Sequence, residues 1–513
     1  MRPDLNESNL ARQFLRCALA SPDRVALRIA GQETTYGELA ASAGRVATWL
    51  LRSGLEGRVG ILARRSRPAY AGILGSCLAG IPYVPIGLDL PVERQIEILR
   101  RGGVRMLVAD RPVDPRIREA VQLAIVGPED EASLEALPPL VSPRSVSPGS
   151  VAYVMFTSGT TGKPKAVFVS VGNVRHFLSV MRERFPIRPD DRVSQFYELN
   201  FDLSIFEIFM TLGAGAALHV VPETQRMAPG AFIRGERLTV WSSVPSVLAF
   251  MSRTRQLAPG SFPALRAAMF CGEPLPVASV EALQAAAPSC AIDNQYGPTE
   301  ATVSCTGEWA RPPLRITESR GIVSIGLPFP GTRTAIVDPE GRFLPRGEKG
   351  ELALAGAQLA IGYDDEELTA RRFPTLAHPA HGPERWYLTG DLACEDQDGY
   401  LHHLGRLDHQ VKVVGHRVEL EEVETHLGAV SGSQAVVVPW PVQDGVASGL
   451  VAFLVQGGWD GPAVQGAMSA RVPSYMVPKR LVALPSLPVA PNGKLDRKAL
   501  ARLLEQGALD VRA

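Results

Sequence analysis

The sequence of 513 residues lacks several features that would assign it to a common class. It has no excess of charge of either sign, because 53 lysine and arginine residues balance 53 aspartate and glutamate residues. This balance removes any overall electrostatic argument for binding nucleic acid or an anionic membrane. No apolar stretch reaches the length that spans a bilayer, and the amino terminus, MRPDLNESNLARQ, is polar where a signal peptide would be apolar. We therefore expect a cytoplasmic protein with neither a nucleic acid nor a membrane as partner.

Cysteine is also scarce. None of the six cysteines has a second cysteine at C-x-x-C spacing, and no histidines accompany them at the spacing of a metal site. This pattern indicates reduced thiols. The residues are Cys17, Cys77, Cys271, Cys290, Cys305 and Cys394.

The pattern of apolar residues changes along the chain. From about Val25 to Leu265, short apolar runs such as VGILA and VAYVMFT alternate with helical patterns such as LAASAGRVATWLLRSG, which predicts parallel sheets covered by helices. After Gly321 the sequence becomes β-rich, with a hairpin expected around Pro339-Glu340-Gly341. From Gly405 another hairpin leads into an amphipathic helix, and we expect the rest of the chain to form a compact α+β unit.

The most informative segment is YVMFTSGTTGKPKAV, from Tyr153 to Val167. A strand ends at Phe156 and is followed by small and hydroxylated residues, whose amide hydrogens and hydroxyls can donate to phosphate oxygens. A P-loop would need Ser or Thr after the lysine at the start of a helix, whereas Pro164 and a strand-like run follow here. A flexible hairpin turn is the alternative to a nucleotide-binding loop. The residues expected to bind the triphosphate are Thr157, Ser158, Gly159, Thr160, Thr161, Gly162 and Lys163.

This segment resembles the signature loop of the adenylate-forming superfamily, which contains acyl-CoA synthetases, firefly-type luciferases and the adenylation domains of nonribosomal peptide synthetases. The resemblance implies an α/β multidomain fold: a large N-terminal domain of two helix-covered sheets with a β-rich subdomain, and a small mobile α+β C-terminal domain. We place these domains at residues 1–408 and 409–513, the β-rich subdomain at about 321–404, and the hinge at Asp408.

A second motif, NQYGPTE, resembles the family pattern NxYGPTE. The resemblance implies that Asn294 and Tyr296 bind adenine, with Gly297 beside them. It also implies that Thr299 contacts the α-phosphate and that Glu300 binds Mg²⁺. Taken alone, the motif could be an ordinary tight turn that leads into a helix.

Three further motifs complete the set. YLTGDL and GRLD resemble the segments in which Asp391 and Arg406 bind the ribose, although TGD alone is a common turn. NGKLDR resembles a mobile loop in which Lys494 contacts the substrate carboxylate and the oxygens of ATP, a role that suits an ammonium group on a flexible stem. The resemblance thus implies ATP and Mg²⁺ as cofactors and assigns catalytic roles to Lys494, Thr161, Thr299 and Glu300.

Further similarity covers nearly the whole chain, including FDLSIFEIF from Phe201 and GELALAGAQLAIGY from Gly350. The sequence departs from the family pattern at three positions. Ala166 stands for the usual glycine, Gly87 for the usual aspartate, and Val414 for the usual arginine. None of these changes removes a reacting group, but Val414 could alter the docking of a pantetheine arm.

Asp202 distinguishes the branches of the family. In amino-acid-activating members this aspartate holds the substrate ammonium, and a carboxylate in an apolar pocket needs such a cation. A helix cap before Leu203 is the alternative. The other residues that the motifs place in the pocket wall are Leu203, Phe206, Ser242, Met269, Cys271, Gln295, Val303 and Ser304. The wall has no charge besides Asp202 and Lys494, which favours a small or medium neutral amino acid such as alanine, serine, threonine, cysteine or proline.

We therefore predict an enzyme that forms an aminoacyl adenylate from ATP, releases pyrophosphate and passes the aminoacyl group to a thiol. Only about twenty residues follow Lys494, so the predicted acceptor is a phosphopantetheinyl carrier protein on another chain, with coenzyme A as the alternative. An MbtH-type helper protein is a further possible partner. The rival hypotheses are an acyl-CoA or aryl-CoA ligase, which has no need of Asp202, a luciferase-like oxidase, and a nucleotide-binding protein that has lost catalysis.

Overall fold

The computed structural model describes residues 9–54, 56–121, 124–159, 163–413, 415–443, 446–488 and 495–506. It divides into two compact units. The first comprises Met1–Leu88, Ile98–Met155 and Ala166–Leu407, and the second comprises Asp89–Glu97, Phe156–Lys165 and Asp408–Ala513. The predictions for Thr160, Thr161, Gly162, Val414 and Lys494 lie outside the described residues.

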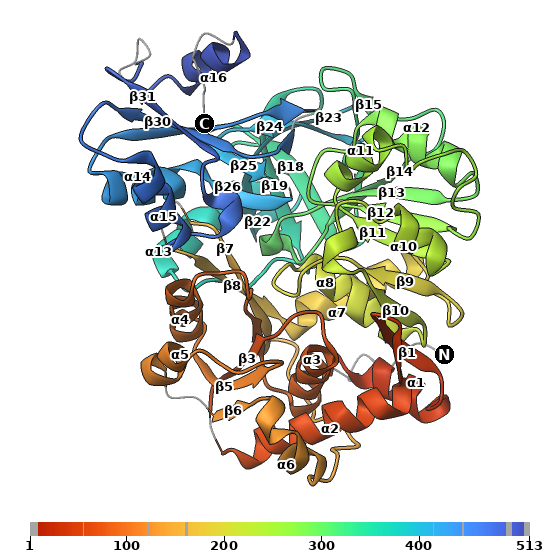
Figure 1. Cartoon of the computed structure of the whole chain (residues 1–513). Helices are drawn as coiled ribbons and strands as arrows, with labels where there is room; N and C mark the ends of the chain where they lie inside the picture. Colours follow the sequence, from red (N-terminus) through yellow and green to blue (C-terminus); the bar gives the residue numbers. More distant parts are fainter. Residues whose placement is uncertain are drawn as a thin grey trace. The chain divides into compact units, whose positions relative to one another are not determined.

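The larger sheet of the first unit is parallel in its centre. Its strand order is β17-β14-β13-β12-β11-β9-β10-β1-β2, and the strands from β13 to β1 pair in parallel (Figure 1). The central strands are buried along their whole length, which explains continuous apolar runs such as AAMF in β12. The strands are β1 (Val25–Ile29), β2 (Gln32–Thr35), β9 (Arg192–Gln195), β10 (Ala217–Val220), β11 (Val240–Ser243), β12 (Ala267–Phe270), β13 (Ala291–Tyr296), β14 (Thr306–Trp309) and β17 (Leu327–Pro328).

A second sheet has the order β20-β8-β7-β4-β3-β5-β6. Helix α3 is buried on all sides, and a Cβ atom at Gly75 would lie 2.7 Å from the carbonyl oxygen of Ala43 in α2, so the glycine lets these two helices pack closely. The strands are β3 (Arg58–Leu62), β4 (Tyr83–Pro85), β5 (Val104–Ala109), β6 (Ala124–Val126), β7 (Val151–Thr157), β8 (Lys165–Ser170) and β20 (Gly362–Tyr363).

The β-rich part of the first unit contains an antiparallel sheet with the order β18-β19-β23-β24. The turn after β18 returns the chain at Gly341, whose amide donates to the carbonyl oxygen of Asp338, and Val337 bridges to Phe343. This geometry confirms the hairpin predicted around Pro339-Glu340-Gly341. The strands are β18 (Thr332–Val337), β19 (Lys349–Gly356), β23 (Tyr387–Glu395) and β24 (Leu401–Arg406); beside them are the pairs β15 (Ile316–Thr317) with β16 (Ile322–Val323) and β21 (Thr375–His378) with β22 (Gly382–Arg385).

The second unit has its own apolar core, formed by residues such as Val437, Ala452 and Met468. A hairpin of β25 and β26 leads into α14, as the sequence predicts. Its sheets have the orders β26-β25-β29-β28 and β27-β30-β31. The strands are β25 (Gln410–Val413), β26 (His416–Glu419), β27 (Ala435–Pro439), β28 (Val442–Gln443), β29 (Val446–Ala447), β30 (Leu450–Val455) and β31 (Arg480–Leu484).

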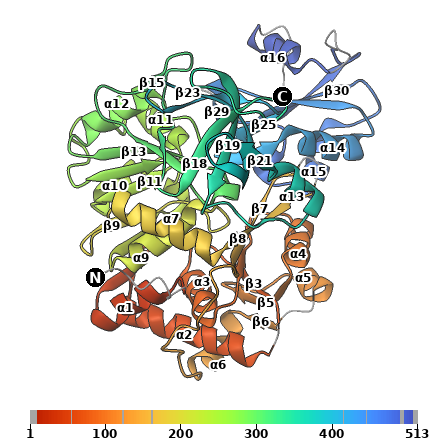
Figure 2. The same cartoon turned by 180° about the vertical axis from the view of Figure 1, so that it is seen from behind.

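Most of the helices are short. Figure 2 shows the molecule from behind, with α7, β9 and β11 in view. In the described part of the chain, no helix combines the length and the apolar character needed to cross a bilayer. The helices are α1 (Arg12–Ala20), α2 (Tyr36–Arg52), α3 (Arg67–Ala79), α4 (Val92–Arg101), α5 (Pro115–Ala120), α6 (Glu131–Glu135), α7 (Val171–Arg184), α8 (Leu203–Ile205), α9 (Thr211–Gly213), α10 (Gly230–Gly235), α11 (Pro245–Arg253), α12 (Val277–Ala286), α13 (Glu366–Arg372), α14 (Leu420–Ser431), α15 (Gly461–Ser469) and α16 (Arg497–Glu505).

Candidate active site

The first unit brings together three residues that the sequence assigns to the nucleoside. Asp391 on β23 lies opposite Arg406 on β24, and Tyr296 ends β13. The Tyr296 hydroxyl donates to Asp391 Oδ2 across 2.5 Å, and Arg406 Nη1 donates to Asp391 Oδ1 across 2.9 Å. His403 Nε2 lies 3.3 Å from the same Oδ1 atom. The sheet register therefore places the predicted ribose ligands side by side.

The Asp391 carboxylate is held in its ionised form. Burial by itself would raise its pKa, but the hydrogen bond from His403 and the positive charge of Arg406 outweigh burial and hold the pKa well below the usual range. An ionised carboxylate accepts hydrogen bonds through both oxygens, which is what binding two neighbouring ribose hydroxyls requires. These residues therefore fit a nucleoside.

Asn294 has a more restricted role than the sequence suggests. Its side chain is buried, and Nδ2 donates to the carbonyl oxygen of Ser324 across 2.8 Å. The predicted contact with the edge of adenine would therefore have to use the side-chain oxygen of Asn294.

Glu300 fits a magnesium ligand by its donor type and its place in the chain. It lies on a single turn, Thr299–Ala301, and is 1% exposed. Tyr363 donates its hydroxyl hydrogen to Glu300 Oε1 across 2.7 Å and so orients the carboxylate. Among the described residues no cluster of three His, Cys, Asp or Glu side chains could hold a metal ion. A Mg²⁺ ion at Glu300 would thus depend on phosphate oxygens for further ligands, as Mg²⁺ commonly does.

The loop after Glu300 is strained and clamped. Thr302 and Val303 have φ angles of 57° and 71°, which β-branched residues rarely adopt. The side-chain amide of buried Gln358 donates to the carbonyl oxygens of Ala301, Thr302 and Ser304, at 3.2, 3.2 and 2.7 Å. Gln358 thus fixes the segment that carries two predicted wall residues, Val303 and Ser304.

Gly297 lets two parts of the site cross at close range. A Cβ atom at this position would lie 2.5 Å from the Cα atom of Ser304 and 2.8 Å from the carbonyl oxygen of Val303. Any other residue would therefore force the backbone of one segment to move.

In the second unit, donors of the phosphate loop are hydrogen-bonded within the unit. The Ser158 hydroxyl donates to the carbonyl oxygen of Arg417 across 2.8 Å, and the Gly159 amide donates to Glu422 Oε2 across 3.0 Å. Thr157 Oγ1 is buried and has no hydrogen-bond partner in the described structure, and Lys163 is exposed. Phosphate binding by Ser158 and Gly159 would require both donors to leave these partners.

Predicted wall residues lie on neighbouring parallel strands, whose carboxyl ends share one edge of the larger sheet. Ser242, Met269 and Gln295 lie on β11, β12 and β13, and Cys271 follows β12 directly. Leu203 and Phe206 belong to the helical segment after Asp202 and are buried, as are Val303 and Ser304. The motifs thus place predicted wall residues on the larger sheet and on the helical segment that follows Asp202.

Two polar residues of this wall are fixed by buried carboxylates that the sequence analysis missed. The Ser242 hydroxyl donates to Glu207, which lies on the π-helical turn Phe206–Met210. Glu207 also accepts from the amides of Phe196 and Tyr197. Burial raises its pKa from 4.5 to about 8 despite these hydrogen bonds.

The second buried carboxylate, Asp293, fixes Gln295. Gln295 Nε2 donates to Asp293 Oδ2 across 2.8 Å, while Gln295 Oε1 accepts from the Ser304 hydroxyl across 2.6 Å. Arg184 binds both oxygens of Asp293, at 3.0 and 2.6 Å. Both hydrogen-bonding ends of the Gln295 amide are therefore engaged within the protein.

Asp202 does not cap the helix that it precedes. Its side chain is 9% exposed and makes no capping hydrogen bond to α8. The helix-cap alternative therefore has no support in the geometry. Asp408, the predicted hinge, accepts from the amide of Gln410 at the start of β25.

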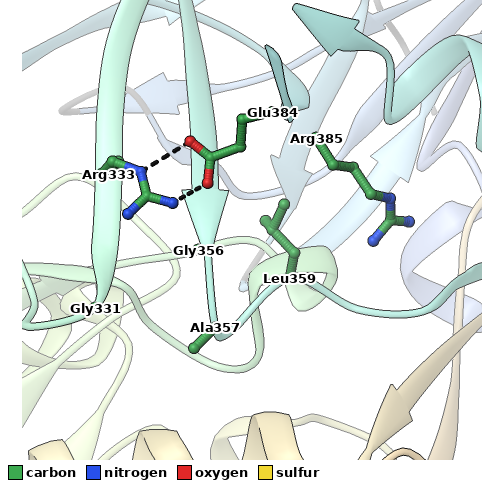
Figure 3. Close-up of a pocket in the computed structure, with 7 residues that line it drawn as sticks. All are labelled: Gly331, Arg333, Gly356, Ala357, Leu359, Glu384 and Arg385. Carbon is green, nitrogen blue, oxygen red and sulfur yellow. Dashed lines mark hydrogen bonds and ion pairs between the residues drawn. The ribbon is translucent and has the colours of Figure 1, made fainter. Parts of the chain in front are cut away.

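A separate pocket of about 400 Å³ lies in the β-rich part of the first unit. There Arg333 and Glu384 form a two-point ion pair, and Arg385 extends beside Leu359 (Figure 3). None of the residues that line it belongs to the predicted nucleotide or substrate set. The lining residues are Gly331, Arg333, Gly356, Ala357, Leu359, Glu384 and Arg385.

Comparisons with known proteins agree with these motifs. A family model described as AMP-binding enzyme matches residues 14–364. The chain is 32% identical over 511 residues to bacitracin synthase 3 of Bacillus licheniformis, covering 96% of this chain and 8% of that protein. It spans less than half the length of the curated relatives it matches.

Two solved structures are similar over most of the chain. The Vibrio cholerae adenylation domain AlmE, in complex with glycyl-adenosine-5'-phosphate, has a TM-score of 0.87 and 32% identity, with 99% of both chains covered. Holo-PA1221, an NRPS protein containing adenylation and PCP domains and bound to a vinylsulfonamide inhibitor, has a TM-score of 0.81 and 26% identity, with 97% of this chain and 85% of that chain covered.

The chain belongs to the AMP-binding enzyme family. This membership confirms the resemblance to adenylate-forming enzymes, and the match to AlmE confirms the predicted α/β fold class.

Proposed function

We propose that this protein activates a small or medium neutral amino acid with ATP, forming an aminoacyl adenylate and pyrophosphate, and transfers the aminoacyl group to the thiol of a separate phosphopantetheinyl carrier protein. The observation that carries the proposal is Asp202, a buried carboxylate that precedes a helix without capping it. A buried carboxylate needs a cation, and the ammonium group of an amino acid supplies one. The glycyl adenylate in the related AlmE structure is consistent with this role.

In the first half-reaction, a substrate carboxylate oxygen attacks the α-phosphorus of ATP. A bond forms between these atoms, the bond to the bridging oxygen breaks, and pyrophosphate leaves. Asp391, Arg406 and Tyr296 orient the nucleoside, and Thr299 lies next to Glu300 for a contact with the α-phosphate. Magnesium held at Glu300 would neutralise phosphate charge. Thr161 and Lys494 are proposed to contact the phosphates and the substrate carboxylate.

In the second half-reaction, the carrier thiol attacks the acyl carbon, a thioester forms, and AMP leaves with the electron pair of the broken bond. We propose that residues 409–513 move about Asp408 between the two steps, which would withdraw Lys494 and admit the thiol. The related PA1221 contains both an adenylation and a PCP domain, which supports a carrier protein as the acceptor. We further propose that the protein acts in the cytoplasm, in natural-product synthesis, with an MbtH-type protein as an optional partner.

The test is exchange of labelled pyrophosphate into ATP, measured with each of the proteinogenic amino acids and with a set of fatty and aryl acids. We expect exchange with one or a few neutral amino acids. Exchange only with fatty or aryl acids would favour the acyl-CoA ligase hypothesis, and a preference for a charged amino acid would refute the assignment of the pocket wall. Transfer is tested separately, by mass spectrometry of a loaded holo-carrier protein against coenzyme A.

A further inference from the structure

Tyr197 lies at the level of the predicted pocket wall, although no motif includes it. In the larger sheet, Val193 pairs with Val240, Val240 with Ala267, and Ala267 with Ala291. Four residues further along each chain, this row becomes Tyr197, Val244, Cys271 and Gln295. Tyr197 lies two residues beyond the end of β9, and Val244 and Cys271 each follow their strand directly, so Tyr197 lies at the same carboxyl edge of the sheet as the predicted wall residues Cys271 and Gln295.

The hydrogen bonds near Tyr197 identify the segment that packs against it. Gln195 and Ser242 lie two residues before Tyr197 and Val244 in the chain. The side chains of both residues donate to Glu207 on the π-helical turn. The amide of Tyr197 itself donates to Glu207 Oε2 across 3.1 Å. The backbone at Tyr197 and the side chains of Gln195 and Ser242 therefore lie against the helical segment that begins after Asp202.

The environment of the Tyr197 hydroxyl agrees with this placement. Burial raises the pKa of Tyr197 well above 10, and electrostatic interactions with Cys271, Glu207, Glu273 and Asp202 raise it further. Two of these groups, Cys271 and Asp202, belong to the predicted substrate wall. Tyr197 thus interacts electrostatically with two residues of the predicted wall, Cys271 and Asp202.

The hydroxyl of Tyr197 has no hydrogen-bond partner in the part of the chain that the structure describes, although the residue is only 2% exposed. The polar side chains predicted for the wall, by contrast, have hydrogen-bond partners within the protein. Ser242 donates to Glu207, Ser304 donates to Gln295, and Gln295 donates to Asp293. Buried hydroxyls are normally hydrogen-bonded, so a buried hydroxyl that lacks a partner and also lies beside the predicted substrate wall is a place where a substrate group can supply one.

We propose that Tyr197 is a specificity-determining residue of the substrate pocket and that its hydroxyl hydrogen-bonds a hydroxyl or amide group on the side chain of the activated amino acid. This inference rests on the proposed amino-acid activation and narrows its substrate class. It favours serine and threonine over alanine and proline among the small neutral amino acids, and it allows asparagine and glutamine. Sites that hydrogen-bond a substrate group discriminate strongly against analogues that lack it.

The test compares pyrophosphate exchange by the wild-type protein, Tyr197→Phe and Tyr83→Phe on pairs of similar shape: threonine with valine, serine with alanine, asparagine with leucine, and glutamine with methionine. Tyr83→Phe is a matched control, because Tyr83 is also a buried tyrosine whose hydroxyl lacks a partner in the described structure, but it lies on β4 in the other sheet. We expect the wild type and Tyr83→Phe to prefer the polar member of one pair. In Tyr197→Phe, kcat/KM for that amino acid should fall about tenfold or more, with the KM for ATP unchanged.

A second measurement needs no variant. The wild-type protein should bind the sulfamoyladenosine analogue of threonine more tightly than that of valine, or the polar analogue of whichever pair it prefers. Preference for the apolar members, or an unchanged preference in a folded Tyr197→Phe protein, would overturn the inference and leave the proposed function standing. Absence of exchange with every amino acid would instead overturn the proposed function, and the inference with it.

Discussion

The hydroxyl of Tyr296 donates to the carboxylate of Asp391 across 2.5 Å, although the two residues lie 95 positions apart in the sequence. This bond joins the end of β13 in the larger sheet to β23 in the β-rich part of the first unit. The predicted adenine contact and the predicted ribose ligand therefore hold each other in place.

Replacing Asp391 with asparagine should remove the charge and keep the shape. We expect kcat/KM for ATP in pyrophosphate exchange to fall about 100-fold or more, because the loss of a charged hydrogen-bonding partner weakens the nucleoside contact and leaves Arg406 without its counter-ion. Asp396→Asn is the control, since Asp396 follows the same strand but pairs with His402. Equal losses in both variants would contradict a specific role for Asp391.

Gln358 should matter for both folding and activity. Replacing it with methionine leaves the carbonyl oxygens of Ala301, Thr302 and Ser304 without their donor, which we expect to lower the free energy of unfolding by about 2–4 kcal/mol. Exchange activity should fall in the folded variant, because the strained loop carries Val303 and Ser304. Urea unfolding and exchange kinetics measure the two effects.

The chain offers a matched control for this variant. Gln284 also donates to three backbone carbonyl oxygens, those of Ala287, Pro288 and Cys290, at the end of α12. Gln284→Met should lose stability and keep the exchange rate of the wild type. Loss of activity in proportion to stability in both variants would show that Gln358 has only a structural role.

The two hypotheses for Asp202 assign it either to the substrate ammonium or to a helix cap. The first role predicts a change in the KM for the amino acid, and the second predicts a loss of stability. If Asp202 binds the substrate ammonium, Asp202→Asn should raise the KM for the amino acid at least tenfold and change stability little. Asp365 is a true cap, since its carboxylate accepts from the amide of Leu368 across 2.8 Å. Asp365→Ala should cost about 1 kcal/mol of stability and leave the KM unchanged. Thermal unfolding and exchange kinetics on the same samples check both expectations.

Glu207 should make stability depend on pH. Its pKa is raised from 4.5 to about 8, so the folded protein binds a proton that the unfolded chain releases between these values. The stability linked to Glu207 is therefore full below about pH 4.5 and is lost as the pH rises towards 8, with a slope of at most about 1.4 kcal/mol per pH unit. Glu207→Gln should flatten the curve of unfolding free energy against pH over this range. Parallel curves for the two proteins would contradict the assignment.

The proposed catalytic role of Lys494 can be tested by substitution, without knowledge of where its side chain lies. Lys494→Ala should reduce pyrophosphate exchange by at least about 1,000-fold, because a positive charge on the reacting phosphate and carboxylate oxygens is lost. Lys498→Ala removes an equal charge from the exposed side of α16 and should leave exchange unchanged. A Lys494→Ala protein with the wild-type exchange rate would refute the proposed catalytic role.

Local sequence patterns predicted the strands and the hairpins well. The runs VGILA, VAYVMFT and LTVWSSV correspond to β3, β7 and β11, because continuous apolar segments of this length suit buried parallel strands. The turn at Gly341 and the hairpin before α14 also follow from local residue preferences. The motifs assigned Asp391 and Arg406 to the ribose, and the register of β23 with β24 places these two residues opposite each other.

The supporting residues could not be predicted in this way, because their partners are distant in the sequence. Gln358 meets Ser304 across a separation of 54 residues, and Arg184 meets Asp293 across 109. Glu207 lies inside the quoted FDLSIFEIF segment, but its link to Ser242 depends on how the helix packs against β11. A polar residue in an apolar segment was the available signal for Glu207, and its partner only became visible in three dimensions.

The crossing at Gly297 limits how this protein could be re-engineered. The backbone at Gly297, next to Tyr296, lies so close to the backbone of Val303 and Ser304 that a side chain added at Gly297 would push the two segments apart and displace the nucleoside contact. Libraries intended to change the accepted amino acid should therefore keep Gly297 and vary positions such as Met269 and Cys271, which lie on β12 and directly after it. We expect such substitutions to preserve the bond between Tyr296 and Asp391, because neither Met269 nor Cys271 takes part in it.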